Sequence, residues 1–159
     1  MPDDAPAQFT YHRRVEFAET DMAGIAHFAN FYRWMEEAEH AYFRDVGVKI
    51  MARNPPGFAP ETHDGEDVVV GWPRVSAKCT FERPAYHEDE LRVDFNVERI
   101  GVKSLTFAVE FWRGEDRLAH GRMKTACCVC RRDGSLRSVP IPESYLSVIH
   151  EADAGAADA

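Results

Sequence analysis

The sequence predicts an α+β fold in which one long helix packs against a curved antiparallel sheet. The prediction rests on three observations: an alternating segment near the start of the chain, a helical segment after it, and four more alternating segments in the second half. Each alternating segment has one apolar and one more polar face, as expected for an antiparallel sheet that is covered on one side. The helical segment carries an apolar face rich in aromatic residues, which favours packing on a broad sheet.

The first strand is predicted over residues 9–17, where apolar and polar residues alternate and Arg13 interrupts the apolar face once. The helix is predicted over residues 30–46, with Asn30 as its N-cap and Gly47 as the residue that stops it. Its apolar positions recur at spacings of three and four, and they are Phe31, Trp34, Met35, Ala38, Tyr42 and Val46.

The second half of the chain holds the remaining predicted elements. Four strands joined by short, turn-like connections are predicted over residues 75–82, 91–98, 105–112 and 123–130. We expect Gly121 to mark a β-bulge near the last strand, and a short helix to cover residues 142–150. Residues 49–67, ahead of these strands, are predicted to form a long loop with at most one turn of helix.

The chain has 159 residues, which suits a single domain. We expect this domain to occupy residues 8–150, between flexible tails at residues 1–7 and 151–159, because the last nine residues contain no large apolar group. No apolar run approaches the roughly 20 residues that a membrane-spanning helix requires. The N-terminus lacks the pattern of a secretory signal, so the expected location is cytoplasmic.

Composition narrows the range of partners and cofactors. The net charge of −8 disfavours nucleic acid as the main partner, because a polyanion would meet an unfavourable field. The four cysteines are expected to be free thiols buried in strands, and the three at 127–130 lack a second ligand pair for zinc. His63 lies near Glu61, Asp64 and Asp67, which we interpret as a solvated acidic loop. We therefore expect no metal.

The segment between Asp21 and Asn30 contains the residues with the most evident chemistry. The carboxylate of Asp21 and the imidazole of His27 lie just ahead of the predicted helix N-terminus, whose N–H groups can polarise a carbonyl and stabilise an oxyanion. A nearby carboxylate can act as nucleophile or general base, so the parts needed for acyl transfer to water are present. From the residues alone, Asp21 can equally be a cap or turn residue, and His27 a boundary histidine.

This segment also resembles a known family. Residues 19–31, ETDMAGIAHFANF, followed by Trp34-Met35-Glu36, are similar to the signature of hotdog-fold acyl-CoA thioesterases of the 4-hydroxybenzoyl-CoA thioesterase-like family. The resemblance continues through FERPAY at 81–86, DELRV at 89–93, IGVKSLTF at 100–107, AHG at 119–121 and PIP at 140–142. It implies a hotdog fold, in which a curved antiparallel sheet wraps one long central helix. It also implies a homodimer whose sheets join edge to edge, commonly paired into a homotetramer, with active sites at the dimer interface.

The resemblance further implies hydrolysis of an acyl-CoA thioester to a free acid and CoA, with no cofactor. Asp21 matches the family's catalytic carboxylate, and the backbone N–H near Phe28 matches the group that polarises the thioester carbonyl. Many members have Tyr-His where this chain has His27-Phe28, so we expect His27 to position the substrate and not to transfer a proton. Asp21 would either attack the carbonyl or activate a water, and the spacing does not distinguish the two.

An anionic CoA substrate requires local cations on this acidic chain. Four cations at strand ends could meet its phosphates, namely Arg99, Lys103, Arg131 and Arg132. Asn30 at the start of the helix and Ser104 at the start of a strand are the other candidates for substrate binding. The alternative for the four cations is that they are ordinary surface charges, and Ser104 can equally be structural.

Two rival acids and two other functions stay open at this point. Glu36 and Glu37 are rivals to Asp21, because some hotdog thioesterases carry the catalytic acid on the central helix. A hotdog hydratase or dehydratase would use a His and an acidic residue in a differently placed motif, which is not found here. A non-catalytic acyl-thioester-binding protein would keep the fold alone, although a purposeless buried carboxylate at Asp21 would lower stability. The acyl group is open, as is the choice between CoA and an acyl carrier protein.

Overall fold

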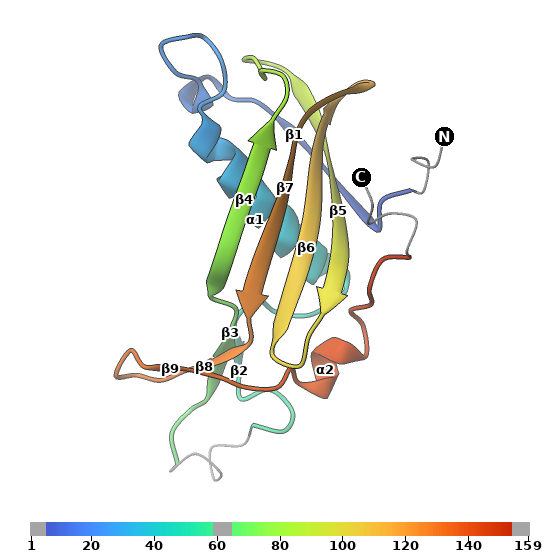
Figure 1. Ribbon diagram of the computed structural model, residues 1–159. Helices are drawn as coiled ribbons and strands as arrows, with labels where there is room; N and C mark the ends of the chain where they lie inside the picture. The colour runs from blue at the N-terminus through green and yellow to red at the C-terminus, as the bar shows by residue number, and fades with distance from the viewer. Residues whose placement is uncertain (1–5, 59–64, 154–159) are drawn as a thin grey trace.

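The structure is a computed structural model that describes residues 6–58 and 65–153. A five-stranded sheet curves around one long helix, α1, and a smaller four-stranded sheet extends from one end (Figure 1). The elements in chain order are β1 (Phe9–Arg14), η1 (Phe17–Glu19), α1 (Phe28–Asp45), β2 (Ala52–Arg53), β3 (Val69–Gly71), β4 (Arg74–Phe81), β5 (Glu90–Ile100), β6 (Ser104–Arg113), β7 (Asp116–Ala126), β8 (Cys128–Cys130), β9 (Leu136–Ser138) and α2 (Glu143–Leu146).

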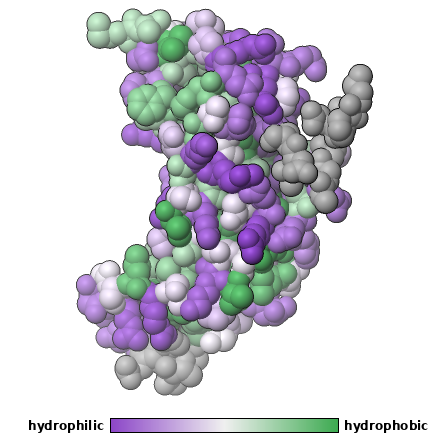
Figure 2. Space-filling view, viewed as in Figure 1, coloured by the Kyte–Doolittle hydropathy of each residue, from purple (hydrophilic) through white to green (hydrophobic). Residues whose placement is uncertain are grey.

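The large sheet has the strand order β1-β5-β6-β7-β4, and every neighbouring pair is antiparallel. Because α1 lies across one face of this curved sheet, the predicted α+β fold of the hotdog type is confirmed (Figure 1). The opposite face is largely hydrophilic (Figure 2) and carries ion pairs such as Arg117 with Glu110 and Arg122 with Glu98. β4 is an edge strand, since it pairs with β7 on one side and no described residue of the chain pairs with its other side.

The core lies between α1 and the inner face of the sheet. The rings of Phe31 and Phe111 are 5.1 Å apart, and those of Tyr42 and Phe95 are 5.2 Å apart. Burying an apolar side chain of this size contributes about 1.5–3 kcal/mol, so this face holds the helix on the sheet. The buried positions of α1 include most of the predicted apolar face and are Phe31, Trp34, Met35, Ala38, Glu39, Tyr42 and Phe43.

The two ends of α1 differ in how well they match the prediction. The helix begins earlier than expected, and its N-cap is His27, whose Nδ1 accepts a hydrogen bond from the N–H of Ala29 at 3.2 Å. The prediction of Asn30 as N-cap was wrong, because its side-chain amide instead donates to the carbonyl oxygen of Glu19 at 2.7 Å. Capping preference favours Asn over His, but this tertiary contact outweighs it. At the other end Gly47, with φ 82°, is the predicted stop.

The predicted strand over 123–130 is divided between two sheets. β7 ends before Cys127, and β8 begins after it as part of the small sheet β2-β3-β8-β9. The change takes place at Cys127, whose N–H donates to the carbonyl of Lys103 and whose own carbonyl accepts from Val139. Alternation of apolar residues continues across this point, so it could not reveal the change of hydrogen-bonding partners.

Other element boundaries also differ from the predicted ones. β1 stops at Arg14, and Phe17, predicted inside the strand, is 76% exposed and begins the turn η1, because Glu16 and Glu19 form a capping box there. The predicted C-terminal helix is reduced to the single turn α2. The loop over 49–67 contains the short strand β2, and its residues 59–64 lie outside the described residues. Within the described ranges, no helix is long and apolar enough to span a membrane.

Both predicted tails extend beyond the described residues, at 1–5 and 154–159. The residues next to them are attached to β5: Gln8 bonds to β5 through its backbone N–H and its side chain, and the Glu151 carboxylate accepts the N–H of Ile100 at 2.7 Å. The expected boundaries at 8 and 150 stay predictions.

Gly121 marks a close approach of α1 to the sheet and not the predicted bulge. It pairs with β4 and β6 in register, while the register shifts of these two ladders lie elsewhere, between Arg74 and Ser76 of β4 and between Phe111 and Trp112 of β6. A Cβ at Gly121 would lie 2.5 Å from Sδ of Met35 and 2.8 Å from the carbonyl oxygen of Lys78. The missing side chain therefore lets the helix rest on the sheet.

We expect Gly121→Ala to lower the free energy of unfolding by about 1–3 kcal/mol, because the added methyl group overlaps a backbone oxygen of β4 that cannot rotate away. Urea unfolding measures the change. As a control, Gly121→Ala is also made in a Met35→Leu background, which removes the sulfur contact but not the contact with Lys78. Most of the loss in the free energy of unfolding should persist in that background. A midpoint equal to that of the wild type would contradict the steric explanation.

Candidate active site

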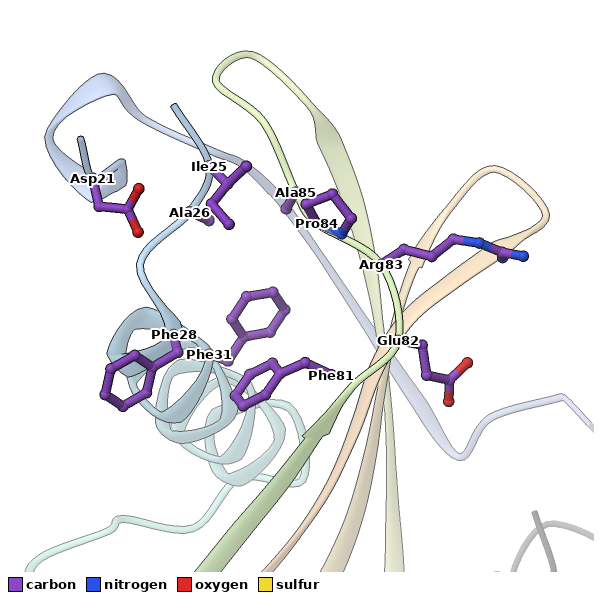
Figure 3. A pocket seen from close by; sticks show the side chains of 10 residues that line it. All are labelled: Asp21, Ile25, Ala26, Phe28, Phe31, Phe81, Glu82, Arg83, Pro84 and Ala85. Carbon is purple, nitrogen blue, oxygen red and sulfur yellow. The ribbon is translucent and has the colours of Figure 1, made fainter. Parts of the chain in front are cut away.

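The turn before α1 and the end of β4 enclose a pocket of about 460 Å³. Figure 3 shows the rings of Phe28, Phe31 and Phe81 gathered near Asp21, while the side chains of Glu82 and Arg83 point away from them. The residues that line the pocket are Asp21, Ile25, Ala26, Phe28, Phe31, Phe81, Glu82, Arg83, Pro84 and Ala85. The pocket is therefore largely apolar, and Asp21 supplies the one carboxylate that does not point away from it.

A tight turn fixes the position of Asp21. Its backbone N–H donates to the carbonyl of Ile25, and its carbonyl accepts from Gly24, whose φ of 77° is one that glycine adopts readily. Its Oδ1 accepts the N–H of Ala23 at 2.8 Å. The other carboxylate oxygen, Oδ2, has no hydrogen-bond partner among the described residues. One oxygen thus holds the turn while the other is available to a substrate or a water.

The N-terminus of α1 supplies a hydrogen-bond donor at the same pocket. The N–H of Ala29 donates to the imidazole of His27, and the N–H of Asn30 donates to the carbonyl of His27. In the described part of the chain the N–H of Phe28 has no acceptor. This donor lies at the positive end of the helix, where it can stabilise an oxyanion.

His27 has a structural role as the N-cap of α1. Because its Nδ1 accepts the cap hydrogen bond, the neutral ring carries its proton on Nε2. The ring also stacks on Phe28, with centroids 4.6 Å apart. Protonation at Nδ1 would break the cap, so the geometry fits the expected positioning role, which stays a prediction.

The sequence reasoning missed the residue that organises this region, Glu19. Its carboxylate accepts hydrogen bonds from Arg13 at 2.6 Å, from the indole of Trp34 at 2.9 Å and from the N–H of Glu16 at 2.8 Å. Its backbone carbonyl accepts the N–H of His27 and also the Asn30 amide described above. Glu19 therefore ties the turn that carries Asp21 to the start of α1.

Arg13 is the buried partner of Glu19. Its guanidinium lies 4.6 Å from the ring centre of Trp34 and also bonds to Glu37 at 2.6 Å. Burial would raise the pKa of Glu19, but hydrogen bonds from Glu16, Trp34 and Arg13 outweigh it and hold that pKa below its usual value. In the sequence, Arg13 interrupts the apolar face of β1, and this interruption was the signal that could have revealed its buried contact with Glu19.

The rival acids lie outside the pocket. Glu36 is exposed and 4.0 Å from Arg74, and Glu37 is held by Arg13 as described. A third helix carboxylate, Glu39, was not predicted: it is 1% exposed and bonds to Arg74 at 2.5 Å. Burial outweighs this partner and raises the pKa of Glu39. Of the carboxylates that the structure describes, only Asp21 and the outward-pointing Glu82 line the pocket.

Cys79 and Cys127 are poor nucleophiles. All four cysteines are free, as expected, and burial raises the pKa of Cys79 and of Cys127 to about 12. The thiols of these two residues stay protonated at neutral pH. The described residues contain no group of three metal-ligating side chains. Of the predicted acidic loop, Asp67 bonds to Arg53 and Asn54, while Glu61, His63 and Asp64 lie outside the described residues.

The predicted cations lie far from this pocket within one chain. The pocket is at the end of the sheet where β4 stops and β5 starts, whereas Arg99, Lys103 and Ser104 are at the opposite end, where β5 stops and β6 starts. Arg131 and Arg132 lie in the β8–β9 turn, which extends from that opposite end (Figure 1). Of the predicted substrate-binding residues, only Asn30 is near Asp21. The others could approach this pocket only from a second copy of the chain.

Comparison with known proteins identifies similar chains. Residues 15–149 match the family described as the thioesterase-like superfamily. The 4-hydroxybenzoyl-CoA thioesterase of Pseudomonas sp. is 28% identical, over 87% of this chain and 95% of its own length. A 1,4-dihydroxy-2-naphthoyl-CoA hydrolase of Nostoc punctiforme is 30% identical, over 82% of this chain and 78% of its own. Among solved structures, a gentisyl-coenzyme A thioesterase superposes with a TM-score of 0.66 at 27% identity, covering 88% of this chain and 98% of its own.

Proposed function

Because the chain belongs to the thioesterase-like superfamily, we propose that it hydrolyses an acyl-CoA thioester to a free carboxylic acid and CoA. One observation carries the proposal. The carboxylate of Asp21, with one oxygen left without a partner, and the N–H of Phe28, without an acceptor in the described chain, belong to one apolar pocket. A base or nucleophile beside an oxyanion donor is the arrangement that acyl transfer requires.

In the proposed reaction the thioester carbonyl oxygen accepts a hydrogen bond from the N–H of Phe28, which stabilises the negative charge that develops on it. Asp21 either attacks the carbonyl carbon, forming an anhydride that water then cleaves, or removes a proton from a water that attacks. On both routes the carbon–sulfur bond breaks and CoA leaves as a thiolate that takes up a proton. Neither route needs a metal or a cofactor.

The proposed enzyme is a homodimer in which the edge strand β4 pairs with β4 of a second copy. This pairing is supported by the outer edge of β4, which has no partner strand among the described residues. The edge carries the exposed apolar side chains of Val75 and Phe81 and lies beside the indented left outline in Figure 2. Antiparallel pairing would bring the Arg74 end of one β4 to the Phe81 end of the other. The far end of the second copy, with Arg99 and Lys103, would then approach this pocket and could meet the phosphates of CoA. Pairing of two dimers into a homotetramer and a cytoplasmic location stay predictions.

We expect Val75→Glu to convert the dimer into a monomer and to lower kcat/KM at least tenfold, because two carboxylates would be placed in the paired strands. Sedimentation velocity and thiol release measure the two effects. Leu136→Glu is the matched control, since Leu136 in β9 is 57% exposed and Val75 is 58% exposed. An active dimer with Val75→Glu would contradict pairing through β4.

The direct test of the function is thiol release from a panel of acyl-CoAs with short, medium, long and aromatic acyl groups. Turnover of any member that depends on Asp21 supports the proposal. Binding of these esters without turnover would instead indicate a non-catalytic binding protein. Addition of water to an enoyl-CoA, with the thioester intact, would indicate a hydratase.

A further inference from the structure

We infer that the acyl site of this enzyme takes an unsubstituted apolar acyl group, such as benzoyl or phenylacetyl, and discriminates against hydroxylated aryl groups. The inference rests on the proposed function and names its substrate class. It separates this chain from the similar proteins above, whose names state hydroxybenzoyl, dihydroxynaphthoyl or gentisyl thioesters.

The side chains of the pocket provide almost no hydrogen-bonding groups. Asp21 is the one polar side chain among the described lining residues that does not point away, and its Oδ1 is already bonded to Ala23. Glu82 is held on the far side of the strand, where it accepts a hydrogen bond from Arg117 at 3.0 Å. The remaining side chains that line the pocket, apart from the outward-pointing Arg83, are apolar: Ile25, Ala26, Phe28, Phe31, Phe81, Pro84 and Ala85.

Three backbone N–H groups of the wall are also occupied. The N–H of Ala26 donates to the carbonyl of Ala85, and the N–H groups of Glu82 and Arg83 both donate to the carbonyl of Leu118. The N–H of Phe28 has no acceptor in the described chain, but the proposed reaction uses it for the thioester carbonyl. A hydroxyl on the acyl group would therefore lose its water without gaining a hydrogen bond from the apolar side chains or from these three N–H groups, while the free Oδ2 of Asp21 is used by the proposed reaction.

The wall instead offers apolar surface that a substrate can cover. Phe28 is 59% exposed and Phe81 is 45% exposed, although both border the pocket. The ring of Phe81 meets that of Phe31 edge-on, with centroids 5.2 Å apart, so the two form a corner for a flat apolar group.

A second copy would extend this apolar surface through its paired strand. Near the other end of β4, Val75 and Ala77 are exposed in the single chain, while the guanidinium of Arg74 is bonded to Glu39 of α1. Antiparallel pairing through β4 would place these apolar side chains toward the Phe81 end. The paired strand would thus add two apolar side chains and one arginine that is already bonded to its own helix.

The size of the discrimination follows from desolvation. Burying a hydroxyl without a hydrogen-bond partner costs about 1–3 kcal/mol, which corresponds to a preference of roughly 5- to 150-fold in kcat/KM. The experiment compares matched pairs that differ by one hydroxyl: benzoyl-CoA with 4-hydroxybenzoyl-CoA, and phenylacetyl-CoA with 4-hydroxyphenylacetyl-CoA. We expect kcat/KM to be at least fivefold higher for the unsubstituted member of each pair. Equal values or a preference for the hydroxylated member would overturn the inference.

A variant at the pocket checks that these rings bind the acyl group. Phe81→Ala should lower kcat/KM for benzoyl-CoA at least tenfold more than for acetyl-CoA, whose methyl group does not reach the rings. Phe17→Ala, which removes an exposed ring that does not line the pocket, should leave the benzoyl-to-acetyl ratio unchanged. An equal loss on both substrates with Phe81→Ala would overturn the assignment of this wall. Failure of the proposed function is distinguishable, because wild type would then release no thiol from any ester.

Discussion

We expect Asp21→Asn to lower kcat for the proposed thioester hydrolysis by about 10²–10⁴-fold, the range that follows when a positioned base or nucleophile is lost. The amide carries no negative charge, so it can neither attack the carbonyl nor take a proton from water. Its oxygen can still accept the N–H of Ala23, which Oδ1 of Asp21 binds at 2.8 Å. The turn should therefore persist, and the free energy of unfolding should change by less than about 1 kcal/mol.

The measurement is thiol release at saturating acyl-CoA, together with the dissociation constant of a non-hydrolysable thioether analogue. Asp21→Asn should lose turnover and keep binding within about threefold, because the analogue is held by the apolar wall. Glu36→Gln is the control, since that helix carboxylate is 57% exposed and does not line the described pocket. If Asp21→Asn keeps more than a tenth of the wild-type kcat, or Glu36→Gln loses as much, the catalytic acid lies elsewhere.

We expect Arg13→Met to lower the free energy of unfolding by about 3 kcal/mol. Methionine is long enough to keep the packing on Trp34, but it leaves the carboxylate of Glu19, whose side chain is 20% exposed, without its cation. Adding Glu19→Gln should restore a large part of the loss, because the unpaired charge is then removed. Glu37→Gln should cost less than about 1 kcal/mol, since that carboxylate is 44% exposed.

The effect of Arg13→Met should also depend on pH. Because the folded-state pKa of Glu19 lies below its usual value of 4.5, the stability that its ionised form contributes is fully present above pH 4.5 and is lost as the pH falls through the lower folded value. Urea unfolding of both proteins at pH 7 and at successive values below 4.5 measures this. The gap between wild type and Arg13→Met should narrow on acidification. A gap that stays constant would mean that packing, and not the ion pair, explains the loss.

The alternating segments predicted the strands of the large sheet well, because one face of that sheet is buried against α1 and the other is exposed. The same periodicity predicted the buried face of the helix. It failed at Cys127, where apolar residues continue while the hydrogen-bonding partners change. It also could not interpret Gly121, since the reason for a glycine there is a sulfur atom on α1 and a carbonyl on β4.

The candidate site was predicted in part. Asp21 and Phe28 could be named because the residues around them form a contiguous segment with a recognisable pattern. Glu19 belongs to the same segment, but its role depends on Arg13 and Trp34, which reach it from β1 and α1. Phe81 and Ala85 line the pocket from the end of β4 and the turn after it, far along the chain from Asp21.

Local patterns in the sequence predict the order and type of the main elements and single out the acid ahead of the helix, because periodicity, turn residues and a contiguous motif are local properties of the chain. The end of the sheet at which each strand begins or stops follows instead from long-range packing. The antiparallel connections place Arg99 and Lys103 at the end opposite Asp21, although all three were predicted to serve one substrate. The same long-range packing brings the carboxylate of Glu19 to Arg13 and the ring of Phe81 to Phe31. Such contacts depend on the direction in which each strand runs and on the face it presents, which no local pattern specifies.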